Sequence, residues 1–245
     1  MNEILIYGDI GYDWWSDDGI TEENVFAGLA QLDATAARHK VRINSPGGRV
    51  DTGLAILSIL RSHKDQMKAV NPEFQLETVC DGYAMSSASV IFMAGDVRTI
   101  ALGGIVMIHD AWSGCYGNAA EMSKTANMLD KMSQNCSQIY ATLCTPAGKD
   151  EAARDSKYFR DLMLAETYFI GDEAVNCGIA TQQDITMEAA LMTSLSPEKL
   201  KGRYVETMTK HYQKRTFRRP SASASVINSK LSLQRLKLMD ATLNS

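Results

Sequence analysis

The sequence predicts an α/β fold in which crossover helices connect a largely parallel sheet. Two observations support this prediction. From residue 3 to residue 109, short apolar runs with strand character alternate with segments whose apolar residues recur at helical spacing. Strands that alternate with helices usually pair in parallel, because a parallel connection needs a crossover of about a dozen residues or more. The 245 residues and 45% hydrophobic content are sufficient for one globular domain with a sizeable core.

The expected elements alternate along the chain. Predicted strands cover residues 3–10, 40–43, 76–79, 98–102 and 104–109, and predicted helices cover residues 22–32, 50–63, 86–94, 119–144, 149–165 and 172–177. Thr21 is a good N-cap for the first helix, since Glu22 and Glu23 follow in its first turn. We expect a glycine turn at Asp81-Gly82 and a surface excursion over residues 64–74.

The helix expected over residues 119–144 is unusually long. At 1.5 Å per residue it would span about 39 Å, which is more than the core of one domain requires. Its apolar residues recur at helical spacing and include several methionines. Such a stripe is typical of a core or a subunit interface rather than of a cofactor site.

The net charge of −4 conceals two oppositely charged parts. Residues 197–245 carry eleven Lys and Arg against three Asp and Glu, a balance of +8, and residues 1–196 carry the remaining fourteen and twenty-six, a balance of −12. We predict one domain over residues 1–195 and a basic, partly disordered extension over residues 196–245. The few aromatic residues among the basic ones do not strongly support nucleic-acid binding, so the extension favours a solvated arm or a dock for the acidic body over a nucleic-acid site.

Several classes of protein are excluded by composition. No run of about 18 apolar residues is present, so no membrane span is expected. The N-terminus lacks the cationic and apolar regions of a secretory signal. Five cysteines, an odd number without metal-ligand spacing, indicate reduced thiols rather than disulfides or a metal site. We therefore expect a cytoplasmic protein.

Three segments place reactive groups at predicted strand ends. The segment C-D-G-Y-A-M-S-S-A-S enters a helix with three serines, Ser86, Ser87 and Ser89, which suit either N-capping or nucleophilic attack at a helix N-terminus. His109 ends an apolar strand 23 residues after Ser86. Asn44-Ser45-Pro46-Gly47-Gly48 ends another strand, and its glycines can aim backbone N–H groups at an oxyanion. Acyl-transfer chemistry needs this combination of nucleophile, base and oxyanion donor.

The segments N-S-P-G-G, G-Y-A-M-S-S-A and V-M-I-H-D resemble the three signature blocks of ClpP-type serine peptidases, peptidase family S14. The resemblance extends from about residue 4 to about residue 181 and is greatest to the ClpP-like head maturation (prohead) proteases of phages and prophages. It implies the ClpP/crotonase-like fold, with residues 119–144 as a long protruding handle helix that packs ring against ring.

The resemblance also implies roles for individual residues. Ser86 would be the nucleophile, and His109 would be the general base that later protonates the leaving amine. The oxyanion hole would be formed by the backbone N–H groups of Gly47 and Ser87, with Gly48 allowing the substrate to approach closely. The resemblance implies neither a metal nor a cofactor.

The sequence departs from the family pattern at the third member of the catalytic triad. The usual aspartate position falls on Thr167, which can hydrogen-bond to the imidazole but cannot neutralise an imidazolium. Glu166, Asp161 and Asp172 are the nearby carboxylates that could substitute. Loss of the acidic member costs on the order of 10⁴ in rate in other serine proteases. An enzyme that cuts each assembly protein a few times tolerates this loss better than a bulk protease does.

The expected partners follow from the same resemblance. They are polypeptide substrates, namely phage capsid, scaffold or portal proteins, and identical subunits in a heptameric ring or a double-ring tetradecamer in the host cytoplasm or the prohead. An ATPase partner is not favoured, and neither a membrane nor nucleic acid is expected. Three alternatives stay open: the proteolytic subunit of an ATP-dependent Clp protease, a catalytically silent ring protein, and an acyl-CoA-binding crotonase without a serine nucleophile.

Overall fold

A seven-stranded sheet forms the centre of the protein in the computed structural model, which describes residues 2–11, 19–145 and 154–184. Its strands are β1 Glu3–Tyr7, β2 Arg38–Ser45, β3 Gln75–Met85, β4 Val97–Ala101, β5 Ile105–Ile108, β6 Thr167–Ile170 and β7 Gln182–Asp184. The main path runs β1-β2-β3-β4-β7, while β5 pairs with the end of β3 and β6 pairs with β5. Only the β5–β6 pairing is antiparallel among these described strands, which confirms the parallel-rich sheet.

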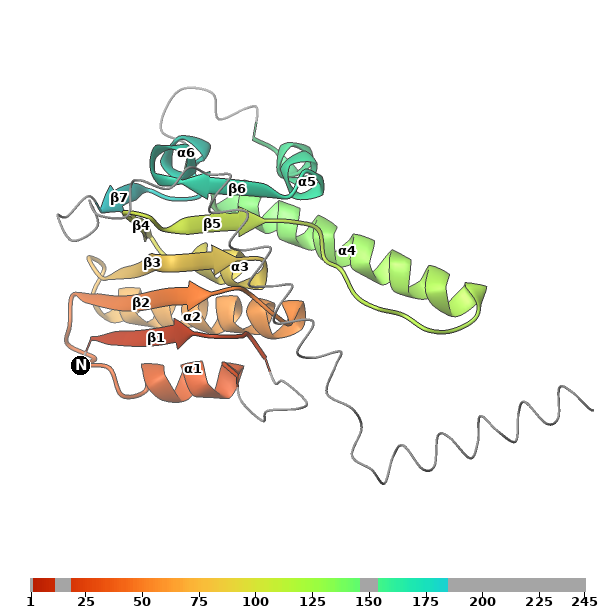
Figure 1. Ribbon diagram of the computed structural model, residues 1–245. Helices are drawn as coiled ribbons and strands as arrows, with labels where there is room; N and C mark the ends of the chain where they lie inside the picture. The colour runs from red at the N-terminus through yellow and green to blue at the C-terminus, as the bar shows by residue number, and fades with distance from the viewer. Residues whose placement is uncertain (1, 12–18, 146–153, 185–245) are drawn as a thin grey trace, which may run out of the picture. The chain divides into compact units, whose positions relative to one another are not determined.

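Six helices accompany the described strands: α1 Glu22–Leu29, α2 Val50–Val70, α3 Ser87–Phe92, α4 Ala119–Leu143, α5 Ser156–Leu164 and α6 Gly171–Cys177. In Figure 1, α2 and α3 lie behind the sheet, α1 lies beside the β1 edge, and α5 and α6 lie at the opposite edge. The helix α4 begins well beyond the sheet and ends behind the upper strands, so it protrudes as the sequence predicts (Figure 1). None of the described helices is both long and apolar enough to span a bilayer.

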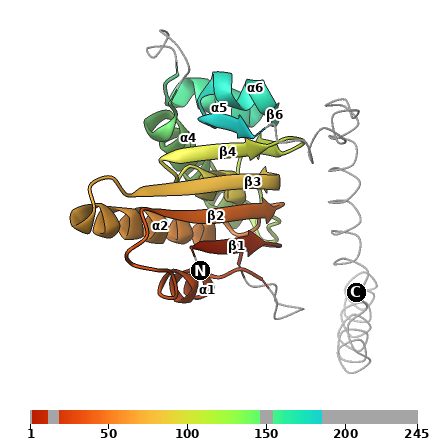
Figure 2. The same ribbon diagram turned by 90° about the vertical axis from the view of Figure 1, so that its left-hand side faces the viewer.

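The strands bury one face more completely than the other. In β2 the side chains of His39, Val41 and Ile43 are buried, while the intervening residues are only partly covered. This alternation of period two is expected when one face of a sheet packs against helices. On the other face, the Arg42 guanidinium binds the Asp81 carboxylate, and the Tyr7 hydroxyl donates to the same carboxylate at 2.8 Å. The side view in Figure 2 shows the helices gathered beside the stacked strands.

Several local predictions are confirmed. Thr21 caps α1 and forms a capping box with Asn24, and α4 begins at Ala119, as predicted, with Asn118 as its N-cap. The helix α6 ends at Gly178, whose φ of +86° is the left-handed conformation that favours glycine.

Other local predictions are wrong. Residues 64–70 continue α2 instead of forming an excursion, and Lys64 and Lys68 both form ion pairs with Asp96, at 3.2 and 3.0 Å. The expected turn at Asp81-Gly82 is instead part of β3. The register between β2 and β3 shifts at this point, so the strand continues past the glycine. The strands β6 and β7 were not predicted. The predicted extension over residues 196–245 lies outside the described residues.

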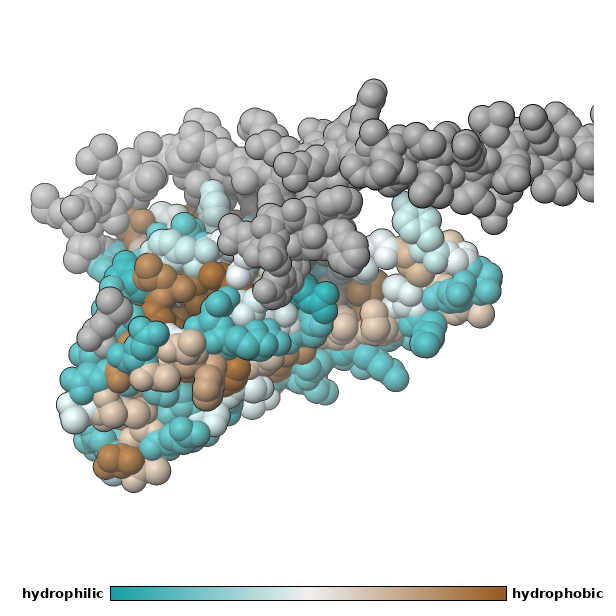
Figure 3. Space-filling model, turned by 90° about the horizontal axis from the view of Figure 1, so that it is seen from below, coloured by the Kyte–Doolittle hydropathy of each residue, from teal (hydrophilic) through white to brown (hydrophobic). Residues whose placement is uncertain are grey.

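The edge of the sheet at β1 carries an apolar groove between the strand and α1. Its apolar lining comes from Ile4, Leu5, Ile20, Val25 and Leu32. Seen from this side, hydrophobic residues gather between hydrophilic ones (Figure 3). The groove is distant in the strand order from β5, which carries His109, so it does not contribute to the site described below.

A buried arginine joins the far edge of the sheet to the helices around it. The Arg98 guanidinium donates to the carbonyl oxygens of Ile179 (2.6 Å), Gly95 (3.0 Å) and Gly178 (3.0 Å) and to the Thr145 hydroxyl. Burial lowers the pKa of Arg98 to about 10. Since backbone carbonyls supply most of these acceptors, the side chain replaces missing backbone donors where α4 and α6 end.

Replacing Arg98 by methionine should lower the free energy of unfolding by about 3–5 kcal/mol, because several buried carbonyl oxygens would lose their donor. Chemical denaturation of the purified protein measures the change. Arg61→Ala, on the exposed side of α2, is the matched control and should change the stability by less than about 0.5 kcal/mol. Equal stability of Arg98→Met and the native protein would contradict this account.

Candidate active site

Ser86 and His109 meet at one end of the sheet. The Ser86 Oγ lies 2.8 Å from the His109 Nε2, which is hydrogen-bonding distance. Both residues are partly exposed, so a substrate can reach them. The arrangement is the one that a serine nucleophile and its general base require.

The sheet register explains why these distant residues meet. The last residues of β3, Tyr83–Met85, pair in parallel with Ile105–Met107 of β5. Parallel strands end at the same edge of a sheet, so the residues that follow them emerge side by side. In addition, the Ser86 N–H donates to the Met107 carbonyl oxygen at 2.9 Å. The nucleophile is therefore bonded directly to the strand that carries its base.

Ser86 adopts a backbone conformation that is rare for a residue with a side chain. Its φ is +54° and its ψ is −126°. Such strain is costly, at about 1–3 kcal/mol, and tends to occur at functional sites. The conformation turns the chain sharply from β3 into α3 and leaves the Ser86 side chain facing His109.

The other two serines of the segment are not available as nucleophiles in this structure. The Ser87 side chain is buried, and its Oγ has no hydrogen-bond partner among the described residues. The Ser89 side chain is also buried, and its hydroxyl contacts the Ser86 carbonyl oxygen at 2.5 Å and the Tyr140 hydroxyl at 2.7 Å. Only Ser86, of the three candidates, contacts a histidine.

The glycine turn after β2 packs directly against the nucleophile. Gly47 and Gly48 have φ values of +96° and +148°. A Cβ on Gly47 would lie 2.6 Å from the Met85 carbonyl oxygen and 2.7 Å from the Ser86 Cβ. The same point is 3.2 Å from the backbone nitrogen of Ser87, so the glycine leaves open the space in front of that N–H. The glycine turn thus brings Gly47 beside Ser86 and Ser87, the residues with which the sequence analysis groups it.

The two glycine N–H groups differ in their partners. The Gly47 N–H donates to the Ser45 Oγ at 3.1 Å, so this donor is already occupied. The Gly48 N–H has no hydrogen bond to any of the described residues, and Gly48 itself is exposed. Ser87 is the first residue of α3, and an N–H at that position has no acceptor within its own helix.

The electrostatic surroundings of His109 are set by burial and two carboxylates. Burial lowers the pKa of His109, while the charges of Glu166 and Asp110 oppose this effect. Asp110 forms an ion pair with Arg160 at 3.0 Å, so much of its charge is already balanced. Glu166 has a φ of +50° and accepts a hydrogen bond from the Tyr168 hydroxyl at 2.6 Å. Sequence reasoning named Glu166 but missed Asp110, although it directly follows the histidine.

Thr167 lies next to the histidine strand but is occupied elsewhere. It pairs with Ile108 across the β5–β6 ladder, and its hydroxyl donates to the Leu162 carbonyl oxygen at 2.7 Å. Within the described ranges, no residue hydrogen-bonds to the His109 Nδ1. Of the other carboxylates considered, Asp161 is exposed and pairs with Lys157 at 2.6 Å, and Asp172 is exposed in the first turn of α6.

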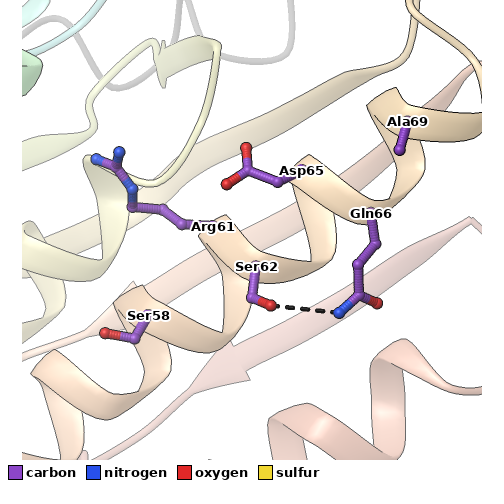
Figure 4. Close-up of a pocket in the computed structure, with 6 residues that line it drawn as sticks. All are labelled: Ser58, Arg61, Ser62, Asp65, Gln66 and Ala69. Atoms are coloured by element: carbon purple, nitrogen blue, oxygen red, sulfur yellow. Dashed lines mark hydrogen bonds between the residues drawn. The ribbon is translucent and has the colours of Figure 1, made fainter.

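Neither a metal cluster nor the pocket on α2 offers a competing site in the described structure. Among the described residues, no cluster of three or more His, Cys, Asp or Glu could hold a metal ion. The pocket drawn in Figure 4 is lined by a single helix, α2, whose contributing residues include Arg61, Asp65 and Gln66. These side chains lie along one exposed face of the helix, where Gln66 donates to Ser62 at 3.3 Å (Figure 4).

Comparison with known proteins agrees with this geometry. The Clp protease family model matches residues 15–186. The ATP-dependent Clp protease proteolytic subunit of Bacteroides fragilis is 30% identical over 166 residues, which cover 64% of this chain and 74% of the relative. Proteolytic subunit 1 of the same protease from Shouchella clausii is 31% identical over 185 residues, which cover 68% of this chain and 91% of the relative. The proteolytic subunit of Deinococcus radiodurans is 30% identical over 164 residues, which cover 65% of this chain and 72% of the relative. The chain therefore belongs to the Clp protease family, a family of serine-type peptidases.

Proposed function

We propose that this chain is a serine endopeptidase in which Ser86 is the nucleophile and His109 is the general base. The observation that carries the proposal is the 2.8 Å contact between Ser86 Oγ and His109 Nε2 at the aligned ends of β3 and β5. Burial lowers the pKa of His109 and so favours the neutral imidazole, the form that can accept the serine proton.

The proposed reaction proceeds in two stages. His109 Nε2 takes the proton of Ser86 while Oγ attacks the scissile carbonyl carbon, and the carbonyl oxygen becomes an oxyanion. His109 then donates this proton to the leaving amine, which gives an acyl-serine. A water molecule, deprotonated by the same imidazole, hydrolyses the acyl group and restores Ser86.

The oxyanion is proposed to bind backbone N–H groups around the glycine turn. Ser87 supplies the donor on the nucleophile's side, since it begins α3 and faces the space that Gly47 leaves open. The second donor comes from the glycine turn. The Gly48 N–H suits this role better than the Gly47 N–H, because the Gly47 N–H already donates to the Ser45 Oγ. Gly47 then serves to keep the space clear.

Glu166 is proposed as the charge that stabilises the protonated His109. Its carboxylate raises the pKa of the histidine and is not paired with a cation in the described contacts, in contrast to Asp110. The Thr167 hydroxyl already donates to a carbonyl oxygen, which supports Glu166 over Thr167 for this role.

The proposed substrates are phage capsid, scaffold or portal proteins, cut within a homo-oligomeric ring during head maturation. Two features support this choice: the absence of an acidic residue at position 167, and the basic segment over residues 197–245. A second candidate is the proteolytic subunit of an ATP-dependent Clp protease, because the similar relatives carry that name.

Incubation with a capsid, scaffold or portal protein from the same source should give defined fragments without ATP or an ATPase. Ser86→Ala should abolish cleavage, since it removes the nucleophile, and it should leave the oligomeric state unchanged. Gel analysis and intact mass measure the fragments. Cleavage only of unfolded casein, and only with a Clp ATPase and ATP, would favour the second candidate, and cleavage by Ser86→Ala would contradict the proposed site.

The pH dependence of kcat/KM should report the environment of His109. Activity should rise with pH through a midpoint below about 6.5, the ordinary histidine value, because burial depresses the pKa. Glu166→Gln removes a charge that raises this pKa, so the midpoint should move to still lower pH. The plateau should also fall about two- to tenfold, because the imidazolium in the transition state loses stabilisation.

Asp161→Asn is the matched control, because it removes a carboxylate from the exposed side of α5. It should leave the midpoint and the plateau unchanged. If the midpoint of the pH profile moved in Thr167→Val but not in Glu166→Gln, Thr167 would be the group that acts on the histidine. That result would refute the assignment of Glu166.

Gly47→Ala should reduce kcat by at least about a hundredfold, the loss expected when an oxyanion donor is displaced. The added methyl group would overlap the Met85 carbonyl and the Ser86 Cβ, and the backbone there has a φ unfavourable to alanine. Gly114→Ala is the control, since a Cβ at that position meets no atom within 4 Å. Full activity in Gly47→Ala would show that the turn does not border the reacting carbonyl.

A further inference from the structure

A buried chain of hydroxyl groups ends on the backbone of the nucleophile. The Ser86 carbonyl oxygen accepts two hydrogen bonds from Ser89, one from the backbone N–H at 3.0 Å and one from the hydroxyl at 2.5 Å. The Ser89 hydroxyl in turn lies 2.7 Å from the hydroxyl of Tyr140, in the last turn and a half of α4. Tyr140 and Ser89 are 2% and 0% exposed.

The direction of these hydrogen bonds is fixed by chemistry. A carbonyl oxygen can only accept, so the Ser89 hydroxyl donates its proton to Ser86. The Ser89 oxygen must then accept from Tyr140. Burial raises the pKa of Tyr140 well above its usual value, so the phenol keeps the proton that it donates. The relay therefore runs from the Tyr140 O–H to the Ser89 O–H to the Ser86 carbonyl, and each bond polarises the next.

The Ser86 carbonyl belongs to the same peptide unit as the Ser87 N–H. In a trans peptide the C=O and N–H point in opposite directions within one plane, and no cis peptide bond occurs in the described structure. Two donors that hold the Ser86 carbonyl therefore also aim the Ser87 N–H away from α3. That N–H faces the space kept open by Gly47, beside the Ser86 side chain. A carbonyl polarised by two donors also makes the N–H of its own amide a stronger donor.

We infer that Ser89 and Tyr140 are positioning residues that orient and polarise the Ser87 N–H toward the oxyanion. This inference rests on the proposed peptidase function and extends it beyond the residues that contact the substrate. It also gives Tyr140 a role that its place on the apolar face of α4 does not suggest. Its ring packs against Phe159 with centroids 5.8 Å apart, a contact that phenylalanine would keep.

The test uses the full-length protein with p-nitrophenyl acetate and a fluorophosphonate probe, which both react at a catalytic serine. Tyr140→Phe should lower kcat about three- to tenfold, because Ser89 still donates but is no longer polarised. Ser89→Ala should lower kcat about tenfold or more, though by less than the 10²–10³ that follows outright loss of an oxyanion donor. KM and the acid midpoint of the pH profile should not change, since neither variant touches the substrate or His109.

The double variant Ser89→Ala/Tyr140→Phe separates a positioning role from a structural one. Ser89→Ala leaves the Tyr140 hydroxyl buried without a partner, which should lower the melting temperature. Removing that hydroxyl as well should recover part of the melting temperature but none of the kcat. Ser137→Ala is the control, because it deletes another buried hydroxyl of α4, one that donates to the Gln134 carbonyl oxygen within the helix. It should keep the native kcat.

Two results would overturn the inference: native kcat in Tyr140→Phe and Ser89→Ala, or a kcat that recovers with stability in the double variant. Failure of the proposed function itself looks different. In that case the native chain would not react with the fluorophosphonate probe, or Ser86→Ala would react as fast as the native chain.

Discussion

The hydrogen bond from the Ser86 N–H to the Met107 carbonyl oxygen is the constraint on which the site depends. It extends the β3–β5 pairing by one residue past the end of β3 and so fixes the nucleophile against the strand that delivers His109. Because the pairing is parallel, both strands end at the same edge, and the distance between serine and imidazole is set by backbone register rather than by flexible side chains.

This register has an energetic cost that the neighbouring segments offset. The positive φ of Ser86 is unfavourable for a residue with a side chain, by about 1–3 kcal/mol. Hydrogen bonds on both sides of the residue hold it there: Met107 accepts from its N–H, and Ser89 donates to its carbonyl. Gly47 can approach because it lacks a Cβ, and a larger residue there would press against the same strained unit. The geometry of the site thus follows from three segments that are distant in sequence.

The sequence was sufficient for the parts of the fold that local patterns determine. Helical periodicity predicted α4, capping chemistry predicted the start of α1, and motif order predicted that Ser86 and His109 belong to one site. The prediction ended α2 too early because it treated residues 64–74 as a surface excursion. Residues 64–70 are helical, and the ion pairs of Lys64 and Lys68 with Asp96 stabilise them, a contact that no local pattern reveals. The strand β6 is only four residues long, and it pairs with β5, a strand far from it in the sequence, so no local pattern reveals it.

The same non-local packing decides the electrostatics of the base. A match to the motif draws attention to position 167, but the chain reverses before β6 through Glu166 in the left-handed conformation, so position 166 carries the charge that acts on His109. The other carboxylate, Asp110, is drawn toward α4 and α5 by Arg160, which also pairs with Asp130 at 2.8 Å. His109 is desolvated, and the carboxylate that acts on it does so through its charge without a hydrogen bond. Such a histidine accepts a proton from serine less readily than one hydrogen-bonded to a buried aspartate. Such a site is suited to a limited number of cuts in a held substrate rather than to rapid turnover, and this links the departure at Thr167 to the kind of work proposed for the protein.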